Sequence, residues 1–376
     1  MTGSRPVTAA EGLQARVVVP REHFTVDVSL EVSDGSTVAV MGPSGAGKST
    51  VLHALAGLDP LVDGEISVDG RVIDRVAPPR VQTAPMSRGV VLLGQKPRLF
   101  PHLSVRENVA FGPRAARADA RAARRGADEW LERVGLPGVG DRMPHELSGG
   151  EQQRVAVARA LAASPRVVLL DEPLVALDPE TAGDIRRMLR DQLAATTTIA
   201  VTHDAADAVA LAERLVVIEA GRVTQEGAVR EVLAAPASGF VASIAGVNRL
   251  LGVASAGAWR SGHVRLVSAD AASRVLAATE GAALAAVFRP GDVRVESGVG
   301  AGAGGAGAGA DAGAGVGGGG NRWEAVVARI EPTLAGVRVH TDGGAVDLNL
   351  DAAAGMETGD RVRLRVDPAA VRFVPA

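Results

Sequence analysis

The 376-residue sequence contains no cysteine and no tyrosine, and phenylalanine and tryptophan together make up only 2% of it. The absence of cysteine excludes disulfide frameworks, thiolate metal sites and cysteine nucleophiles. The scarcity of aromatic rings argues against a surface that stacks unpaired nucleic-acid bases. Function must therefore rest on other side chains.

Long apolar runs and a strong net charge are also missing. No apolar stretch approaches the roughly 18 residues of a membrane span, and the polar start Met1–Pro6 lacks a signal-peptide core. We therefore expect neither a span nor a leader. The net charge is only −3, so no strong field points to nucleic acid. Only two lysines occur, Lys48 and Lys96, so each retained lysine needs a reason.

Up to about Phe240, strand-like and helical patterns alternate, which predicts an α/β domain. The strands are expected at Arg16–Val19, Phe24–Val32, Thr37–Met41, Gly89–Leu93, Val167–Asp171, Thr198–Thr202 and Leu215–Glu219. The helices are expected at Lys48–Ala56, Arg114–Val134, Gly150–Ala162, Pro179–Ala194 and Ala205–Ala212.

The rest of the chain reads as a small all-β domain, so we place the two domains at residues 1–239 and 240–376. Arg361–Val366 alternates arginine with apolar residues, and Asp342-Gly343-Gly344 separates two short strands as a hairpin turn would. Gly298–Gly320 is almost entirely glycine and alanine, which predicts a flexible loop.

The run Gly42-Pro43-Ser44-Gly45-Ala46-Gly47-Lys48-Ser49 matches the phosphate-binding loop G-x-x-x-x-G-K-[ST]. It follows an expected strand and opens an expected helix, which is the context such a loop needs. Backbone N–H groups and the helix N-terminus would hold phosphates, Lys48 would reach the β- and γ-phosphates, and Ser49 would coordinate Mg²⁺. Nucleotide binding is thus predicted for Gly42, Pro43, Ser44, Gly45, Ala46, Gly47, Lys48, Ser49 and Thr50.

The strand Val167–Asp171 ends in two carboxylates, Asp171 and Glu172. Beside a phosphate-binding loop, Asp171 fits a Mg²⁺ site, and Glu172 is placed to act as a general base on the attacking water.

Four further motifs, in the order in which the family has them, make the chain resemble the ATP-binding cassette (ABC) ATPases. Leu147-Ser148-Gly149-Gly150-Glu151 resembles the signature sequence, and Gln95 follows its strand as the Q-loop glutamine does. Ala176-Leu177-Asp178 resembles the D-loop, and His203 resembles the switch histidine.

The resemblance implies a P-loop NTPase fold with an antiparallel β subdomain and a helical subdomain, with ATP and Mg²⁺ as cofactors. It implies an ATP-sandwich homodimer, in which Ser148, Gly149, Gly150 and Asp178 meet the nucleotide of a second copy. The N–H groups of Ser148–Gly150, at the start of a helix, would form a second anion site. Gln95, Ser49 and Asp171 would bind the Mg²⁺ ion. The catalytic residues would be Glu172, His203, Gln95 and Lys48.

The family usually stacks an aromatic ring on the adenine from its first β-hairpin. This chain offers Arg16–Pro20 there, and Phe24 is the nearest aromatic residue. Which residue meets the adenine is left open.

The all-β domain resembles the TOBE/Mop-like domains found behind importer cassettes, and it favours an importer ATPase over an exporter or a soluble repair or translation protein. The segment Arg98–Val109 looks like that of molybdate importers. We therefore expect import of molybdate or a related oxyanion, with sulfate, iron, polyamine or sugar as the alternatives. The expected partners are permease subunits on the cytoplasmic membrane face, contacted through Phe100–Val109, and, through them, a solute-binding protein.

A different class of function remains possible on the sequence alone. Arg361, Arg363 and Arg365 lie on one strand face and could contact nucleic-acid phosphates. The lack of aromatic residues makes a solvated face the better interpretation, and we expect no nucleic-acid partner.

Overall fold

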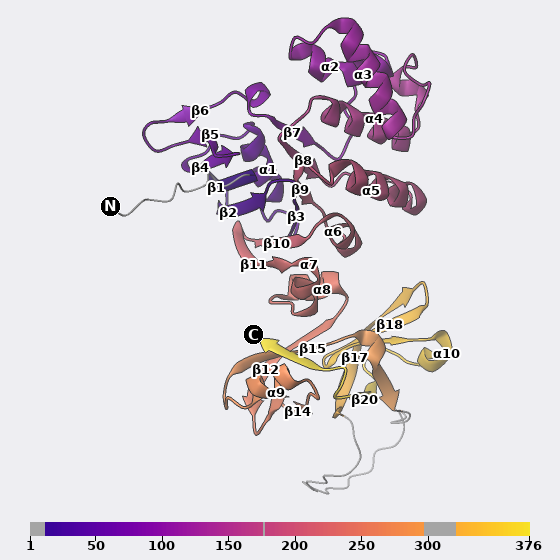
Figure 1. Cartoon of the computed structure of the whole chain (residues 1–376). Helices are drawn as coiled ribbons and strands as arrows, with labels where there is room; N and C mark the ends of the chain where they lie inside the picture. Colours follow the sequence, from indigo (N-terminus) through magenta and orange to yellow (C-terminus); the bar gives the residue numbers. More distant parts are fainter. Residues whose placement is uncertain (1–11, 176, 297–320) are drawn as a thin grey trace, which may run out of the picture. The chain divides into compact units, whose positions relative to one another are not determined.

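The computed structural model describes residues 12–175, 177–296 and 321–376. Contacts between residues divide the chain into two units, Met1–Val232 and Leu233–Ala376, whereas the sequence placed a domain boundary after residue 239. Figure 1 shows the elements of both units coloured along the chain. Among the described helices, none is long and apolar enough to cross a membrane.

The first unit begins with an antiparallel sheet in the order β2-β1-β4-β5-β6. Its inward side chains alternate with exposed ones, as a half-buried sheet requires. A short 3₁₀ helix, η1 (Pro85–Ser87), follows it. The strands are β1 (Gly12–Pro20), β2 (Thr25–Ser33), β4 (Asp63–Val68), β5 (Arg71–Arg75) and β6 (Val81–Gln82).

The second sheet has the order β11-β10-β3-β9-β8-β7 and is parallel except for β11. Val167 and Leu169 of β8 pack into one core cluster with β1, β2 and α1, whereas Val168 and Leu170 pack into another with α4 and α5. This two-sided burial explains the continuous apolar runs of the sequence. The elements are β3 (Thr37–Met41), β7 (Val90–Leu93), β8 (Val167–Asp171), β9 (Thr197–Val201), β10 (Arg214–Glu219), β11 (Arg222–Ala228), α1 (Lys48–Ala56), α5 (Pro179–Leu193), α6 (Ala205–Leu211) and α7 (Val229–Ala234).

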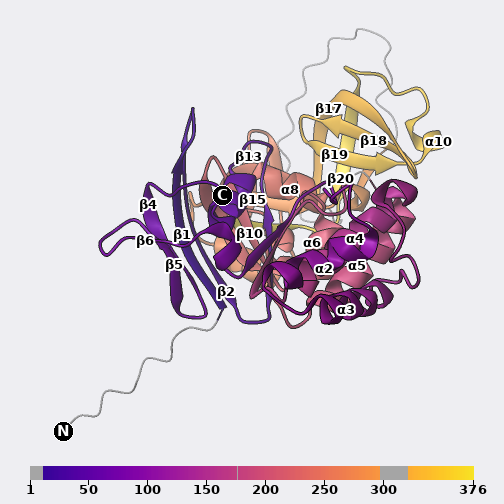
Figure 2. The ribbon, with the colours of Figure 1, turned by 90° about the horizontal axis from the view of Figure 1, so that it is seen from above.

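A helical subdomain is formed by α2 (Val105–Ala115), α3 (Ala120–Arg133) and α4 (Gly149–Ala162), with η2 (Pro144–Glu146) before α4. Figures 1 and 2 show these helices clustered apart from strands β1, β2 and β4–β6. The single helix predicted over Arg114–Val134 is wrong. The chain breaks at Arg117, whose φ is +67°, and Asp119 caps the start of α3 by accepting a hydrogen bond from the Ala122 N–H.

The second unit contains two five-stranded sheets, ordered β14-β13-β12-β15-β21 and β16-β20-β17-β18-β19. It is mainly β, but it also holds short helices that the sequence reading did not expect. Its elements are α8 (Gly239–Ala245), β12 (Asn248–Ser255), β13 (Ala258–Ser261), β14 (Val264–Leu266), α9 (Ala271–Ala277), β15 (Ala283–Phe288), η3 (Pro290–Asp292), β16 (Val293–Glu296), β17 (Asn321–Thr333), β18 (Gly336–Thr341), β19 (Gly344–Leu348), α10 (Leu350–Ala353), β20 (Arg361–Val366) and β21 (Arg372–Pro375).

Inward-facing side chains from both sheets form the core of this unit. Within it, the rings of Phe288 and Trp323 pack edge-on, with 5.9 Å between their centroids. The predicted alternation in β20 is confirmed, because Val362, Leu364 and Val366 are buried. The predicted hairpin is confirmed as the β18–β19 pair. The glycine- and alanine-rich segment 298–320 lies outside the described residues.

Candidate functional site

The phosphate-binding loop lies where the sequence placed it, between β3 and α1. Two of its glycines are required by geometry. A Cβ on Gly42 would lie 2.0 Å from the Ile218 carbonyl oxygen, and Gly47 caps α1 with φ +103°. The loop therefore brings its backbone N–H groups to the N-terminus of α1, where an anion is stabilised.

Lys48 is turned over this loop. Its Nζ donates to the carbonyl oxygens of Gly42 at 2.7 Å and Pro43 at 2.9 Å. Burial lowers the pKa of Lys48 below its ordinary value, while Glu172 and Asp171 act in the opposite direction. The ammonium group is thus held over the loop in a partly buried place, where the cost of desolvation outweighs the attraction of the two nearby carboxylates.

Asp171 ends β8 beside the first turn of α1, and the Ser49 Oγ donates to its Oδ1 at 3.4 Å. Burial raises the pKa of the Asp171 carboxyl, and the Ser49 hydrogen bond opposes that rise. A hydroxyl and a carboxylate side by side are oxygen ligands of the kind that Mg²⁺ prefers.

Glu172 follows with a left-handed backbone, φ +50°, which a residue other than glycine rarely adopts. Its N–H donates to the Val201 carbonyl of β9 at 3.0 Å, which fixes this conformation. The Gln95 Nε2 lies 3.4 Å and the His203 Nδ1 lies 3.6 Å from the Glu172 Oε2. Side chains that follow β7 and β9 therefore meet the Glu172 carboxylate, which follows β8.

The Ser148–Gly150 segment forms a separate site at the start of α4. The Ser148 N–H donates to Glu151 Oε2 at 2.8 Å, and the Glu151 N–H donates to Ser148 Oγ at 3.3 Å, which is a reciprocal capping box. The hydrogen bond from the Ser148 N–H lowers the pKa of Glu151. Within the described residues, no hydrogen bond or ion pair joins Ser148–Gly150 to the phosphate-binding loop.

Asp178 accepts from the Thr181 N–H at 3.0 Å and caps α5, and its hydrogen bonds with Thr181 lower its pKa. The same Thr181 lies against Gly150, because a Cβ there would come within 2.6 Å of the threonine Cγ2. Asp178 and the Ser148–Gly150 segment are therefore close to one another, whereas Ala176 of the predicted D-loop is not among the described residues.

Two polar contacts at the site were missed by the sequence reading. The Gln153 Nε2 donates to the Pro173 carbonyl at 2.9 Å and so ties α4 to the residue after Glu172. The Arg21 Nε donates to the Thr50 Oγ1 at 2.8 Å, at the start of α1. Neither residue belongs to a spacing pattern that could have signalled these contacts.

Phe24 lies beside the loop, and a Cβ on Gly47 would be 3.5 Å from its ring. The ring also packs on the first core cluster and against Gly221. Its role toward a base stays a prediction, and its partial burial limits the ring surface left for stacking.

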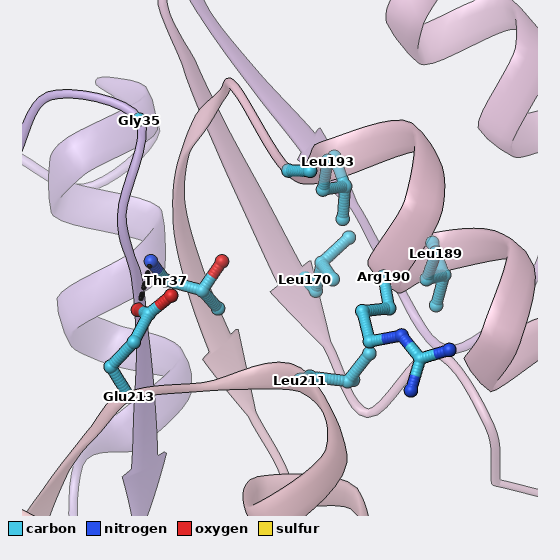
Figure 3. A pocket seen from close by; sticks show the side chains of 9 residues that line it. Gly35, Thr37, Leu170, Leu189, Arg190, Leu193, Leu211 and Glu213 are labelled. Atoms are coloured by element: carbon cyan, nitrogen blue, oxygen red, sulfur yellow. Dashed lines mark hydrogen bonds between the residues drawn. The ribbon is translucent and has the colours of Figure 1, made fainter.

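One small pocket of about 140 Å³ lies away from this chemistry. Figure 3 shows Glu213 reaching the N–H of Thr37, a 2.9 Å hydrogen bond at the beginning of β3. The phosphate-binding loop follows the other end of that strand, so this pocket is separate from the nucleotide site. Its lining consists of Gly35, Thr37, Leu170, Leu189, Arg190, Leu193, Ala194, Leu211 and Glu213.

The segment Phe100–Val109 spans a turn and the first half of α2. Phe100 is half-buried, and the centroid of its ring lies 4.6 Å from the ring centroid of Phe111, which is 47% exposed. Asn108 is fully buried and its side chain bonds the backbone of Phe100, Leu103 and Ser104. Phe100, together with Phe111 two residues beyond the segment, thus presents aromatic surface on a backbone that is held in place.

In the second unit, one arginine of the strand face considered for nucleic acid and one arginine of the neighbouring strand have acidic partners. Arg363 pairs with Glu324 at 3.2 Å, and Arg322 on the neighbouring strand pairs with Glu296 at 2.8 Å. Paired charges on a strand face fit a solvated surface. No observation favours nucleic acid as the ligand.

Comparison with known proteins gives one family and several relatives. Residues 25–175 match the family model described as ABC transporter. The molybdenum import ATP-binding protein ModC of Mycobacterium tuberculosis is 47% identical over 64% of this chain and 66% of its own length. The Fe(3+) ions import ATP-binding protein FbpC of Streptomyces avermitilis is 46% identical over 61% of this chain and 65% of its own.

The sulfate/thiosulfate import ATP-binding protein CysA of Mycobacterium tuberculosis is 43% identical over 58% of this chain and 61% of its own length. The chain thus spans slightly less than two thirds of these curated relatives. A solved structure, described as a dimeric post-hydrolysis state of the ATP-binding cassette MJ0796 bound to ADP and Pi, has 30% identity and a TM-score of 0.50. It matches over 58% of this chain and 99% of its own, so the cassette fold predicted from the sequence is confirmed.

Proposed function

The chain belongs to the ATP-binding cassette family, and from this premise we propose that it is the ATP-hydrolysing subunit of an importer. The observation that carries the proposal is the meeting of Gln95, Glu172 and His203 at one edge of the sheet, beside the loop that holds Lys48. These groups suit hydrolysis of a phosphate anhydride, because one carboxylate can accept a proton from water while amide and imidazole groups orient that water.

The cofactors we propose are ATP and Mg²⁺. Lys48 and the backbone of Gly42–Gly47 would hold the phosphates, and Ser49, Asp171 and Gln95 would hold the metal. When bound, Mg²⁺ neutralises phosphate charge and so aids departure of the leaving group. The phosphate charge would also raise the pKa of Lys48, because an anion favours the protonated ammonium that burial disfavours.

The second anion site points to a homodimer. Ser148–Gly150 lies at a helix N-terminus, close to Asp178 through Thr181, and has no bond to the chain's own phosphate-binding loop in the described part. Facing copies would let this site meet the γ-phosphate that the other copy holds. The cassette relative of known structure is described as dimeric, which supports this arrangement.

We propose permease subunits as partners, met through Phe100–Val109, and through them a solute-binding protein. The chain would then lie on the cytoplasmic face of the membrane. The names of the relatives support import of molybdate or a related oxyanion, with iron and sulfate as alternatives. The functional division would follow residue 239, with the TOBE/Mop-like domain over residues 240–376.

The test is Glu172→Gln in the full chain. The amide is nearly isosteric but cannot accept the proton, so hydrolysis should fall by about 10²-fold or more while ATP binding persists. Because ATP then stays between the two anion sites, an ATP-dependent dimer should accumulate on size exclusion.

Glu180→Gln is the matched control, because Glu180 lies in the first turn of α5 and outside the cluster around Glu172. It should keep wild-type turnover. Wild-type turnover in Glu172→Gln would remove Glu172 from the base role, and a wild type that does not hydrolyse ATP would refute the proposed function.

A further inference from the structure

The turn that carries His203 is held by a buried hydroxyl. Thr202 directly precedes the histidine and is 4% exposed. Its Oγ1 accepts a hydrogen bond of 3.1 Å from the Asp204 N–H, so one side chain spans the histidine. A hydroxyl that bonds the N–H two residues later closes a turn of the backbone. The backbone at His203 is therefore fixed on both sides, although 63% of the histidine side chain is exposed.

The proton of the same hydroxyl goes to a buried carboxylate. A hydroxyl has one proton to donate besides its acceptor lone pairs, and Thr202 donates it to the Asp207 Oδ2 at 3.1 Å. Asp207 lies in the first turn of α6 and is 7% exposed. The proposed hydrolysis gives this carboxylate no role with the phosphates, the metal or the water. A carboxylate is costly to bury, so its place here needs another reason.

An arginine of α5 accompanies this carboxylate. The Arg186 Nε donates to the Asp207 Oδ1 at 2.7 Å, and the two side chains are only 25% and 10% exposed. A charge-assisted pair of this kind is stronger than a neutral hydrogen bond. α5 packs into the core of the first unit through the fully buried Ile185 and Leu189. The carboxylate is therefore held between a fixed helix and the Thr202 hydroxyl, with one oxygen bonded to each.

These contacts lead to the residue proposed as the general base. The Glu172 N–H donates to the Val201 carbonyl at 3.0 Å, so the strand ends that precede Glu172 and His203 are tied together. With both strand ends fixed, the turn at His203 determines where the imidazole lies. The His203 Nδ1 is 3.6 Å from the Glu172 Oε2, which is just beyond a hydrogen bond. A small displacement of the turn therefore decides whether that hydrogen bond forms.

We propose that Thr202 and Asp207 are positioning residues of the hydrolytic site, which act through His203 and hold its imidazole against Glu172. Arg186 supports Asp207 from α5. This role concerns the hydrolytic step and not the binding of nucleotide, because the phosphate-binding loop lies on other elements, between β3 and α1. This inference rests on the proposed function.

The experiment compares the steady-state hydrolysis of ATP with Mg²⁺ by variants of the full chain. Thr202→Val keeps the shape of the side chain without its hydroxyl, and it should lower kcat by about tenfold or more while KM stays within about twofold. Thr202→Ser restores the hydroxyl and should recover most of kcat. Asp207→Asn loses the charge that faces Arg186 and should lower kcat several-fold, again with little change in KM. Asp191→Asn is the matched control with wild-type kinetics, because Asp191 lies on α5 and is 64% exposed.

A double-mutant cycle separates this role from a structural one. Single-turnover hydrolysis is measured for Thr202→Val, for His203→Ala and for the two combined. If the hydroxyl acts through the imidazole, Thr202→Val has no further effect once residue 203 is alanine. If the hydroxyl only stabilises the fold, its effect persists in that background and follows the unfolding temperature. Should Thr202→Val not fold, Asp207→Asn takes its place in the cycle, because its amide has nearly the same shape as the carboxylate and still accepts from Thr202.

Three results would overturn the positioning role. They are wild-type kcat in Thr202→Val, a failure of Thr202→Ser to recover kcat, and an equal effect of Thr202→Val with and without the His203 imidazole. A raised KM that accounts for the whole loss of activity would also overturn it, because the hydroxyl would then serve nucleotide binding. A wild type that does not hydrolyse ATP would instead refute the proposed function, and this inference with it.

Discussion

Polar side chains that join strands in the second unit are bonded differently from those around Glu172 in the first unit. In the second unit, Asn248 exchanges hydrogen bonds of 2.6 and 2.8 Å with the backbone of Ala345, and Asn321 does the same with Val267 at 2.7 and 2.9 Å. Around Glu172 in the first unit, the corresponding contacts measure 3.4 and 3.6 Å. The short hydrogen bonds of Asn248 and Asn321 hold the strands of the second unit together. The long contacts around Glu172 are of the kind that shorten in a catalytic site only when the ligand binds.

The pKa shifts of Lys48 and Asp171 at the nucleotide site differ in the same sense from those of two carboxylates in the second unit. Hydrogen bonds from Ser273 and His340 lower the pKa values of Asp270 and Glu331 in the second unit, which favours their charged forms. In the first unit, burial lowers the pKa of Lys48 and raises that of Asp171, which disfavours theirs. A charged ligand can stabilise the charged forms of Lys48 and Asp171, which the fold alone disfavours. These two groups therefore contribute to ligand binding at the expense of folding stability.

The largest effect is expected for a substitution at the nucleotide site of the first unit. Lys48→Ala should weaken ATP binding and hydrolysis together, by about 10²-fold, because a charge on the phosphates is lost in the ground and transition states alike. The free energy of unfolding should change little, because a half-buried cation disfavoured by its surroundings is removed. Calorimetric binding and a steady-state ATPase assay measure the first effect, and thermal unfolding measures the second.

Lys96→Ala is the matched control, because Lys96 is the other lysine and lies exposed, outside the loop. It should bind ATP like the wild type. Equal nucleotide affinity in Lys48→Ala and wild type would contradict the assignment of the loop.

A second prediction separates docking from catalysis in the first unit. Phe100→Ala combined with Leu103→Ala removes half-buried apolar groups from a backbone that Asn108 holds. We expect near-normal ATPase activity in the isolated chain and loss of assembly or transport in the complete transporter. Reconstitution with the permease measures this.

Asn108→Ala serves as the comparison variant, since it releases the loop backbone and should lower the unfolding temperature. If the Phe100 and Leu103 double variant loses stability and ATPase in the isolated chain, these residues are core and not a docking surface.

Local patterns predicted much of the fold, and the reasons for the failures are local as well. Thr37–Met41, Lys48–Ala56 and Val167–Asp171 were predicted with the bounds observed, because a buried strand or a glycine-flanked helix signals itself within a few residues. The helix expected over Arg114–Val134 failed because its first residues belong to the last turn of α2 and the chain then breaks at Arg117 before α3 begins. Composition does not show where that preceding helix begins.

Some parts of the candidate site were also predictable from local patterns, and others were not. Motif order named Gln95, Glu172 and His203, and the structure brings their side chains together. The contact between Arg21 and Thr50 joins residues far apart in sequence, and no periodicity or motif encodes it. Such a contact depends on how one hairpin packs on one helix, which only the folded chain shows.

A third prediction tests the strand-joining role in the second unit. Asn248→Ala would leave the Ala345 N–H and carbonyl without their partner, at a cost of about 1–3 kcal/mol. Scanning calorimetry should show a lower unfolding temperature, while ATP affinity stays unchanged. Val275→Ala, at an exposed position, should change neither. A loss of ATP affinity in Asn248→Ala would show that the two kinds of polar contact are not separable.

The smallest expected effect concerns a residue that fits neither side of the comparison. Glu151 belongs to the signature-like motif, yet its 2.8 Å bond with the Ser148 N–H is as short as those of the second unit. Glu151→Gln keeps a side chain that can complete the capping box but loses the negative charge at the N-terminus of α4. At neutral pH and low salt we expect a loss of about 0.3 kcal/mol, at the low end for such charges because this carboxylate is partly solvated.

The pH dependence of this difference is the decisive measurement. The folded-state pKa of Glu151 lies below its ordinary value, so its stabilisation is complete above the unfolded-state pKa and disappears as the pH falls through the folded-state pKa. Glutamine does not titrate, so the two unfolding temperatures should converge as the solution is acidified through that range, and added salt should narrow the gap at neutral pH. A gap that is constant with pH would mean that the hydrogen bond alone matters. A gap that widens in acid would mean that the charge destabilises α4, and Glu151 would then belong with the poorly compensated charges of the site.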